Sequence, residues 1–487
     1  MSKIRFKVTF KFHCLFPRMI LLALLCVTLF SATGLLHAEP ETQRAPNVIL
    51  LMSDDQGWGD VGFNGHPHIH TPHLDEMAAN GVIFTRFYAA APLCSPTRAS
   101  VMTGRFPHRT GIMAAHTAGL RVGETTIAEA LKSRGYRTGF FGKWHMGWVK
   151  PEQLSSRGFY SPPWHHGFDA SFATTSAVPT YDPTVTPEGW NQWGQKAGTP
   201  WKEGTAYVHD GEVVMDNLDG DDSRIIMDRV IPFVEENQDR PFFAVIWFHA
   251  PHEPVVAGPE DRALYAEFDD LTQHYLGSLT AMDREIGRLR KVLRDLNLER
   301  DTVLFFCSDN GPSSSLERKG AASSGPFRGT KHKMYEGGLL VPACAEWPGV
   351  IEPGTVTEVR SSTVDYFPTV AQLAGFSFSK NQNRPIDGID LMPVIQGEVT
   401  SRELPMYFGY RRLFTEIDGQ AVIDGDYKLL KEAKANPSIR LYNLASDPYE
   451  ENDLSEEYPE KFAEMLRQLQ AIDEEAAASR DGRDYRY

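Results

Sequence analysis

Short apolar segments alternate with amphipathic ones over the first three quarters of the chain. Continuous apolar runs are typical of buried strands, and they occur at 47–53 (NVILLMS), 82–89 (VIFTRFYA), 136–141, 241–248 and 302–307. Helical spacing, helix-start residues and glycine or asparagine stops predict helices at 72–80, 96–103, 126–134 and 269–295. This alternation predicts a doubly wound α/β domain, which we place at residues 45–375.

The pattern changes between about residues 148 and 240, where strand and helix periodicity fades. Five of the nine tryptophans lie in this segment: Trp148, Trp164, Trp190, Trp193 and Trp201. One interpretation is a long insertion with its own satellite core. The other is a loop wall that stacks on sugar rings, because aromatic faces combine apolar area with a polar edge.

Beyond a predicted linker at 376–385, the pattern favours a smaller C-terminal subdomain at 386–487. Segments 406–410, 420–424 and 427–430 have the composition of antiparallel strands, and 459–477 has that of a helix. The charged residues 480–487 are expected to form a frayed tail. The subdomain is therefore of the α+β type.

The first 38 residues have the features of a secretory signal. A basic region precedes the apolar run 19–30, and Leu36-His37-Ala38 offers a cleavage point. The alternative is an uncleaved anchor, but the run is short for a membrane span. We therefore expect an exported protein, periplasmic or secreted, with no stable membrane span after cleavage.

Charge and cysteine content narrow the function. The leader carries five basic residues and no acidic ones, so its removal takes the formal net charge from −15 to −20. Such a charge disfavours nucleic-acid binding. Only Cys94, Cys307 and Cys344 lie beyond the leader, which is too few for a disulfide scaffold.

Acidic and amide residues follow the ends of two predicted core strands. Asp54 and Asp55 come directly after 47–53, and Asp309 and Asn310 follow 302–307. In open α/β sheets, ligands bind at the carboxyl ends of the strands. Three carboxylates and an amide suit Ca²⁺, with Mg²⁺ as the alternative. Each pair alone is also compatible with an ordinary turn or helix cap.

The stretch LCSPTRASVMTGR, residues 93–105, combines a cysteine with a helix start. Ser95 is expected to cap a helix that begins at Pro96 and ends at Gly104, with Cys94 at its N-terminus. The free N–H groups there favour negative charge, and Arg98 adds a cation. A buried thiol without chemistry is the alternative.

This stretch closely resembles the maturation signature of the type I, formylglycine-dependent sulfatases, which are arylsulfatase-like members of the alkaline-phosphatase superfamily. Cys94, Pro96, Arg98 and residues 103–105 match the signature. The C-terminal segment 441–454 also resembles the family's terminal signature. The resemblance implies a large doubly wound mixed sheet sandwiched by helices, with a smaller C-terminal subdomain that contains an antiparallel sheet.

The resemblance also implies the site. Cys94 is expected to be oxidised to formylglycine (3-oxoalanine) by a formylglycine-generating enzyme, and its hydrated aldehyde is the family's nucleophile. One Ca²⁺ per chain is expected on Asp54, Asp55, Asp309, Asn310 and an oxygen at position 94. The resemblance gives catalytic roles to five further residues that fall in family motifs: Arg98, Lys143, His145, His252 and Lys331. Three of these, Lys143, His252 and Lys331, are also expected to bind the substrate.

In the implied reaction, Arg98, Lys143 and the cation offset sulfate charge, while His252 and Lys331 protonate or stabilise the leaving alcohol. His145 is the base that collapses the sulfated intermediate. One departure from the family is the absence of a basic residue shortly after Glu336-Gly337-Gly338, where 339–341 read LLV. This reduces what can be inferred about substrate contacts.

The sequence thus predicts an exported sulfatase, a sulfuric ester hydrolase that acts on a sulfated carbohydrate or a small sulfate ester. A phosphonate or phosphate diester hydrolase of the same superfamily is the alternative. A catalytically silent anion-binding protein, in which Cys94 stays a thiol, is the second alternative.

Overall fold

The computed structural model describes residues 45–150, 159–191, 195–201, 207–377, 384–411, 417–432 and 438–485, together with Lys7 and Thr9. The chain divides into two units, 1–44 and 45–487, and every element below belongs to the second. Apart from Lys7 and Thr9, the predicted leader 1–38 lies outside the described residues, as do Trp193 and most of the predicted linker. Within the described part of the chain, no helix has both the length and the hydrophobicity of a membrane span.

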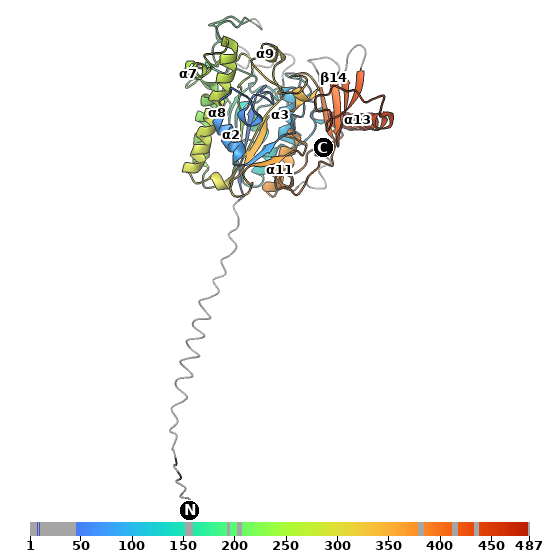
Figure 1. Cartoon of the computed structure of the whole chain (residues 1–487). Coiled ribbons are helices and arrows are strands. Elements are labelled where there is room, and N and C mark those ends of the chain that lie inside the picture. The colour runs from blue at the N-terminus through green and yellow to red at the C-terminus, as the bar shows by residue number, and fades with distance from the viewer. Residues whose placement is uncertain are drawn as a thin grey trace, which may run out of the picture. The chain divides into compact units, whose positions relative to one another are not determined.

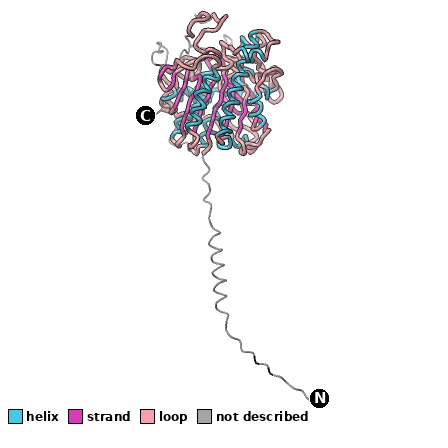
Figure 2. The backbone as a smooth tube through the Cα atoms, turned by 90° about the vertical axis from the view of Figure 1, so that its left-hand side faces the viewer, coloured by secondary structure: helices cyan, strands magenta, loops and turns pink. Residues whose placement is uncertain are grey.

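A mixed sheet of ten strands forms the centre of the second unit. Its first strand, Asn47–Ser53, is the predicted run NVILLMS, and it pairs in parallel with strands on both sides. Figure 2 shows the strands running side by side with helices alongside them. In spatial order the strands are β11 (Thr355–Thr357), β2 (Val82–Phe84), β10 (Ala343–Glu346), β9 (Thr302–Ser308), β1 (Asn47–Ser53), β8 (Phe242–Trp247), β4 (Arg137–Lys143), β5 (Ala170–Thr174), β6 (Val208–His209) and β7 (Glu212–Val213).

Alternate residues of β1 face two different hydrophobic layers. Val48 and Leu50 belong to a core that includes residues of the helices α3 (94–103), α5 (127–132) and α11 (366–373). Ile49 and Leu51 belong to a second core that includes residues of the helices α2 (72–79), α6 (222–236) and α8 (270–295). Because a strand points successive side chains to opposite faces, a strand that is apolar throughout must be covered on both sides. Figure 1 shows α2 and α8 on one side of the sheet and α3 and α11 on the other.

The predicted helices form with small shifts at their ends, and several short helices were not predicted. The longest helix, Asp270–Asp295, has Asp269 as its N-cap. The carboxylate of Asp269 accepts hydrogen bonds from the backbone N–H groups of Leu271 and Thr272. The α-helices are α2 (Pro72–Ala79), α3 (Cys94–Thr103), α4 (Pro107–Thr110), α5 (Ile127–Lys132), α6 (Asp222–Glu236), α7 (Pro259–Ala263), α8 (Asp270–Asp295), α9 (Ser314–Arg318), α10 (Glu336–Leu339), α11 (Tyr366–Leu373), α12 (Met392–Ile395) and α13 (Pro459–Arg480). Four 3₁₀ turns add to them: η1 (Gly62–Asn64), η3 (Pro163–His165), η4 (Glu299–Asp301) and η5 (Thr363–Asp365).

The expectation that residues 148–240 lack regular structure is wrong in part. Strand β5 pairs in parallel with β4 inside the large sheet, and α6 covers one face. The sequence pattern does not predict β5, because Ser171 and Thr174 are polar. Both side chains are nevertheless buried, and they form hydrogen bonds with Asp210 and His249. The pattern does not predict α6, because Pro232 lies inside it and a proline ordinarily marks a helix end.

The predicted strand at 82–89 is also divided in two. Residues 82–84 form β2, which pairs with β10 and β11 in the large sheet. The chain turns at Thr85 and Arg86, and 87–88 form β3, which pairs with β12 (Ser361–Ser362) in a separate two-stranded sheet. Both fragments are apolar because both are buried, so the sequence alone shows one run.

A second, antiparallel sheet of four strands lies in the C-terminal part of the chain, as predicted. Three of its strands were expected, whereas β16 was not predicted, and only its last three residues, 441–443, lie in the segment matched to the family's terminal signature. Helix α13 follows and contributes Met465 and Leu469 to the core on this sheet. The strands are β13 (Met406–Arg411), β14 (Ile417–Asp424), β15 (Tyr427–Glu432) and β16 (Ser438–Asn443).

The chain end does not form the frayed tail expected from its charges. Asp484 is buried and forms an ion pair with Arg105, which is itself 1% exposed. The next residue, Tyr485, donates a hydrogen bond to Glu124, which also pairs with Arg105. Charged residues at a terminus are ordinarily solvated, but here they satisfy a guanidinium that the fold has buried.

Candidate active site

The carboxyl ends of β1 and β9 bring the predicted acidic residues together. The two strands are parallel neighbours with Ser53 opposite Ser308, so the residues that follow them meet at one edge of the sheet. The backbone N–H of Asp55 donates to Asp309 Oδ1 at 3.1 Å, and Asn310 Nδ2 donates to Asp55 Oδ1 at 2.7 Å. Because a carboxylate oxygen of Asp54 also lies within 4.8 Å of one of Asp309, four residues from segments about 250 positions apart in the chain form a single cluster.

Helix α3 places Cys94 beside this cluster. The cysteine is 2% exposed, and its sulfur lies within 4.8 Å of carboxylate oxygens of Asp54 and Asp309. The predicted cap is wrong: the helix begins at Cys94, Leu93 is the N-cap, and Ser95 Oγ is buried without a hydrogen-bond partner. Pro96 tolerates this earlier start because none of the first four N–H groups of a helix has an intrahelical partner. Gly104 ends the helix in a left-handed conformation, as predicted.

Each carboxylate of the cluster contacts its own basic side chain. Arg98, one turn after Cys94, donates from Nη2 to Asp309 Oδ2 at 2.6 Å. The other two pairs are Lys143 with Asp54, at 2.5 Å, and Lys331 with Asp55, at 2.6 Å and 2.7 Å. Positive charge therefore surrounds the acids on three sides.

Lys143 reaches the cluster because β4 approaches β8 closely just before it. Gly142 has a φ of +107°, and a Cβ atom there would lie 1.9 Å from the carbonyl oxygen of Trp247. Only glycine fits this position. Lys143 is thus the last residue of the strand itself, and its carbonyl accepts a hydrogen bond from Arg98 at 2.9 Å.

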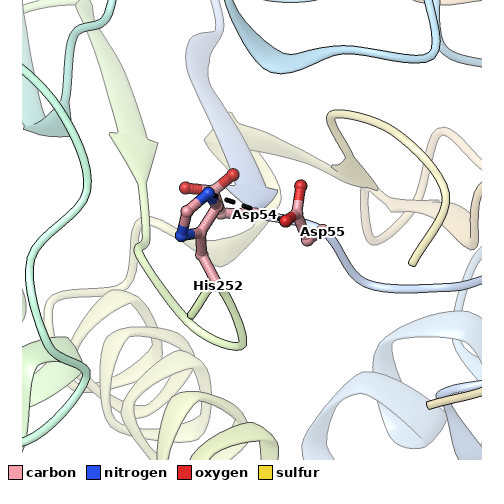
Figure 3. Close-up of side chains that lie close together, drawn as sticks. All are labelled: Asp54, Asp55 and His252. Carbon is pink, nitrogen blue, oxygen red and sulfur yellow. Dashed lines mark ion pairs between the residues drawn. The ribbon is translucent and has the colours of Figure 1, made fainter. Parts of the chain in front are cut away.

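His252 lies on the loop after β8, with its imidazole directed toward the two carboxylates at the end of β1 (Figure 3). Its Nε2 is 3.6 Å from Asp55 Oδ2, and its Nδ1 is 2.5 Å from the carbonyl oxygen of Glu253. Since a carbonyl only accepts hydrogen bonds, Nδ1 carries the proton and Nε2 of the neutral ring is free to accept one. The side chains of His252 and Lys331 are 15% and 10% exposed, so the cluster opens to the surface on their side.

His145 follows the end of β4, the strand next to β8, and it contacts a histidine that was not predicted for the site. Its Nε2 is 3.3 Å from Nε2 of His116, while its Nδ1 is buried without a hydrogen-bond partner. Both residues have left-handed backbones, with φ of 57°. His116 also stacks on Trp148. A lone histidine in a loop of no clear periodicity gives no sequence signal for such a contact.

A second missed group supports the strand next to the site. His249, at the end of β8, is fully buried between Asp222 and Thr174, at 2.7 Å and 2.8 Å. Asp222 also accepts a hydrogen bond from Tyr207. The strand-end position of His249 was visible in the sequence, but its partners lie in the segment for which no regular structure was expected.

Burial and neighbouring charges set the ionisation of the acids. Burial acts to raise the pKa of Asp54, but Lys143, His252 and Arg98 outweigh it and hold that pKa below its ordinary value. The pKa of Asp55 is lowered in the same way, since Lys331 outweighs burial. Burial, with the charge of Asp54, raises the pKa of Asp309 to about 7.

The nitrogen bases divide into one charged and two neutral groups. Burial acts to lower the pKa of Lys331, but the attraction of Asp55 raises it overall, so the ammonium stays protonated. Burial lowers the pKa of His252 to about 4 and places that of His145 well below its ordinary value. At neutral pH both histidines are therefore proton acceptors. Burial also raises the pKa of the Cys94 thiol.

The donor set of the acid cluster suits a hard cation. Asp54 Oδ1 and Asn310 Oδ1 are buried and have no hydrogen-bond partner. Unpaired buried acceptors are costly unless something binds them. The four residues offer carboxylate and amide oxygens, which is the ligand type of Ca²⁺ or Mg²⁺, and the imidazole of His252 also lies within 4.8 Å of Asp54 and Asp55.

The cluster as a whole has the chemistry of a site for an anion that is attacked by a side chain. Fixed cations surround a buried position at a helix N-terminus, two neutral histidines follow the neighbouring strands β8 and β4, and the side of His252 and Lys331 is open. All residues predicted for the site lie in or beside this cluster.

Comparison with known proteins agrees with this chemistry. The sequence matches the sulfatase family over residues 46–376, and the C-terminal part of N-sulphoglucosamine sulphohydrolase over residues 328–476. N-acetylgalactosamine-6-sulfatase of Sus scrofa is 35% identical over 392 residues, which are 75% of this chain and 69% of that protein. Arylsulfatase A of Homo sapiens is 33% identical over 508 residues, which are 94% of this chain and 90% of that protein.

Solved structures give the same result for the fold. The crystal structure of Ps i-CgsB in complex with k-i-k-neocarrahexaose is 28% identical, with a TM-score of 0.76, and the match covers 88% of this chain and 93% of that one. Phosphonate monoester hydrolase of Agrobacterium radiobacter, at 22% identity and a TM-score of 0.62, shares the fold over 88% of this chain and 96% of that one. These matches confirm the predicted class, a large mixed sheet covered by helices with a separate antiparallel sheet.

Proposed function

This chain belongs to the sulfatase family and is a sulfuric ester hydrolase; from this premise we propose that it removes sulfate from a carbohydrate. The observation that carries the proposal is the buried cluster in which Cys94, at the start of α3, lies within 4.8 Å of Asp54 and Asp309. The names of two similar proteins support the substrate class. One is an N-acetylgalactosamine-6-sulfatase, and the other was crystallised with a neocarrahexaose.

Two groups outside the polypeptide's ordinary chemistry complete the proposed site. Cys94, once converted to formylglycine by a formylglycine-generating enzyme, supplies a hydroxyl of the hydrated aldehyde as the nucleophile. One Ca²⁺, held by Asp54, Asp55, Asp309, Asn310 and residue 94, supplies positive charge to the sulfate oxygens. The unpaired oxygens of Asp54 and Asn310 support this ligand set.

The basic side chains bind and orient the sulfate. Lys143 and Arg98 are fully buried and lie against Asp54 and Asp309, so their charges are fixed before substrate arrives. Preorganised charge of this kind stabilises the transition state without reorganisation. Arg98 is held further by stacking on Trp247, 5.0 Å from the ring centroid.

Proton transfers fall to the three remaining groups. Lys331 is charged and lies on the open side, so it gives a proton or a hydrogen bond to the leaving alcohol oxygen. His252 lies beside it on Asp55 and exchanges a proton through Nε2. His145 is neutral, and its unpartnered Nδ1 takes the proton when the sulfated intermediate breaks down.

The same proposal covers the organisation of the chain. Residues 1–38 direct export to the periplasm or the exterior and are removed. Residues 45–375 form the catalytic domain, and 386–487 form a C-terminal subdomain that closes one side of it.

The test compares two substrates and one peptide. The purified chain is expected to hydrolyse an aryl sulfate at least tenfold faster than an aryl phosphate diester. An aldehyde-reactive hydrazide is expected to label the tryptic peptide that contains residue 94. The variant Cys94→Ala should show neither activity nor label while keeping the thermal midpoint of the parent. Preferred hydrolysis of the phosphate diester would reject the proposal.

A screen of sulfated mono- and oligosaccharides, scored by free sulfate, then tests the carbohydrate assignment. Release of sulfate from aryl esters alone would reject the carbohydrate and leave the reaction class in place.

A further inference from the structure

Two adjoining cavities form a cleft at the side of the large sheet away from β5. The first, of about 480 Å³, lies between the end of β11 and the C-terminal sheet. The second, of about 260 Å³, is lined in part by three aromatic rings, those of Trp58, Phe327 and Tyr449. Arg86, Glu358 and Arg360 line both cavities, so we treat the two as one and call it the β2–β11 cleft.

The direction of the strands places this cleft at the same edge of the sheet as the acid cluster. Strand β10 is antiparallel to both β9 and β2, and β11 is parallel to β2. Strands β9, β2 and β11 therefore all run the same way, and Arg86 and Glu358 follow their strands as Asp309 follows β9. Neighbouring strands lie about 4.8 Å apart, so β2 and β11 are about 10 Å and 14 Å from β9.

Chain connections give the same spacing on the aromatic side of the cleft. Trp58 is three residues beyond Asp55, and Phe327 is four residues before Lys331. A chain extends at most about 3.6 Å per residue, so the aromatic wall lies within about 15 Å of the acid cluster. A short oligosaccharide spans such a distance.

The cleft carries an incompletely paired cation. Arg360 is 10% exposed, and its buried Nε and Nη2 atoms have no carboxylate partner, although the guanidinium interacts with the hydroxyl of Tyr88 in the same cavity. Its Nη1 contacts Asp426 at 3.2 Å. Arg86 is one-third exposed, and its nearest carboxylate, that of Glu358, is 3.7 Å away, beyond hydrogen-bond distance. A guanidinium presents a planar set of N–H groups that matches a tetrahedral or planar oxyanion.

The aromatic wall completes a site for a sugar. Trp58 and Phe327 meet edge to face at 5.1 Å, and Phe327 lies 6.4 Å from Tyr449, which is 43% exposed. The indole Nε1 of Trp58 is buried without a hydrogen-bond partner. Aromatic rings with an adjacent N–H donor bind the apolar face and a hydroxyl of a sugar together.

We propose that the β2–β11 cleft binds a second sulfated sugar of the substrate, next to or near the one that loses its sulfate. Arg360 and Arg86 hold the second sulfate, and Trp58, Phe327 and Tyr449 contact the ring. Three acids line the cleft: Glu336 is buried and paired with Lys428, whereas Glu358 and Asp426 on the rim are 74% and 56% exposed in their side chains. Exposed ion pairs contribute little, so a sulfate displaces the two rim acids at small cost. This inference rests on the proposed function, because it names a further part of the same substrate.

The test uses substrates that differ only in the second sulfate. Arg86→Gln is expected to lower kcat/KM about tenfold for a chondroitin 6-sulfate tetrasaccharide with two sulfates. The same variant should leave kcat/KM unchanged for a tetrasaccharide with one sulfate and for an aryl sulfate. Arg360→Gln should act in the same direction. Lys291→Gln, which removes an exposed charge from α8, is the matched control and should change none of the three values.

A binding experiment separates this inference from the proposed function. The Cys94→Ala chain is titrated by calorimetry with the two-sulfate tetrasaccharide and with a sulfated neocarrahexaose. Weaker binding of either by the Arg86→Gln, Cys94→Ala chain supports the cleft, even if the parent hydrolyses no sulfate ester. Equal binding by both chains, or no binding of either saccharide, overturns the cleft. An equal loss of kcat/KM for the aryl sulfate also overturns it, since that loss marks a structural effect.

Discussion

At the residue scale, the contact between His116 and His145 decides which nitrogen of His145 is free. Two Nε2 atoms 3.3 Å apart share one proton, so one ring donates and the other accepts. The Nδ1 atom of His145 is the nitrogen without a partner, and a base needs its lone pair there. His145 then donates from Nε2, and His116 is a positioning residue that selects this tautomer.

We predict that His116→Asn lowers kcat about tenfold with little change in KM, because the tautomer of His145 is no longer fixed. Asparagine tolerates the left-handed backbone of position 116. The acid limb of the pH–rate profile should also move, because His116 acts on the pKa of His145. An unchanged profile with a proportional rise in KM would contradict the assignment.

Sequence reasoning located the residues whose positions follow from strand ends and missed those that depend on loops. Asp54, Asp55 and Asp309 were found because the carboxyl ends of parallel strands meet at one edge. His116 lies in a loop without periodicity, so only its contact reveals it. Ser95 was assigned as a cap because the rule for Ser-Pro fits two registers, and packing of α3 selects the earlier one.

At the element scale, the residues after α13 are joined by a buried ion pair to the loop that follows α3. Asp484 pairs with Arg105, and both are nearly inaccessible. Breaking a buried pair leaves an uncompensated charge, although Arg105 keeps Glu124 as a second partner at 2.9 Å.

We predict that Asp484→Ala lowers the free energy of unfolding by about 2 kcal/mol, measured by urea denaturation. Asp481→Ala is the matched control. Its carboxylate is 71% exposed and pairs only at the surface with Arg480, so the change should stay within about 0.5 kcal/mol. Similar effects of the two substitutions would show that the terminus does not stabilise the fold.

Strands β1, β2, β4, β8 and β9 of the large sheet follow from their apolar runs, whereas its other five strands, helix α6 and strand β16 of the C-terminal sheet do not. Ser171 and Thr174 make the segment 170–174 partly polar, so it does not resemble a buried strand. The partners that satisfy these two side chains, Asp210 and His249, lie far along the chain. The proline in α6 contradicts a helix locally, and tertiary packing overrides it. Local sequence patterns do not show hydrogen bonds and packing between residues that lie far apart in the chain, and these contacts decide such elements.

At the scale of the whole molecule, buried histidines make folding sensitive to acid. Burial lowers the pKa of His116 and of His166 to about 4, and it also lowers that of His108. An unfolded histidine titrates near 6.5, so between about pH 4 and 6.5 the unfolded chain binds protons that the folded chain does not. The contribution of these histidines to stability is therefore present above pH 6.5 and is lost as the pH falls through this window, while carboxyl groups whose pKa burial raises to about 7, such as those of Asp60 and Asp283, act in the opposite direction.

We predict that the burial of neutral His166 contributes up to about 3 kcal/mol of stability at pH 7, which is lost as the pH falls toward 4.5. His166→Gln should reduce the slope of midpoint against pH, because the ring that stacks on Trp144 no longer titrates. Scanning calorimetry at five pH values measures the slope. An identical slope in parent and variant would contradict the burial argument.

We predict further that removing divalent cations lowers both activity and the thermal midpoint, because an ion bound only by the folded chain stabilises it by mass action. Treatment with EGTA followed by added Ca²⁺ should restore both. Asp309→Asn should weaken the response of the midpoint to Ca²⁺. A midpoint indifferent to chelation and to Ca²⁺ would reject the cation site.

The pairing of each carboxylate of the cluster with at least one basic side chain has a consequence for the charge of the site. Asp54, Asp55 and Asp309 are already neutralised when the core closes, so the fold needs no ion to tolerate them. A divalent cation held by the remaining oxygens of Asp54 and Asn310 would add a surplus of positive charge. That surplus would make the local charge of the cluster positive, so that the cluster would attract anions although the formal net charge of the whole chain is −15.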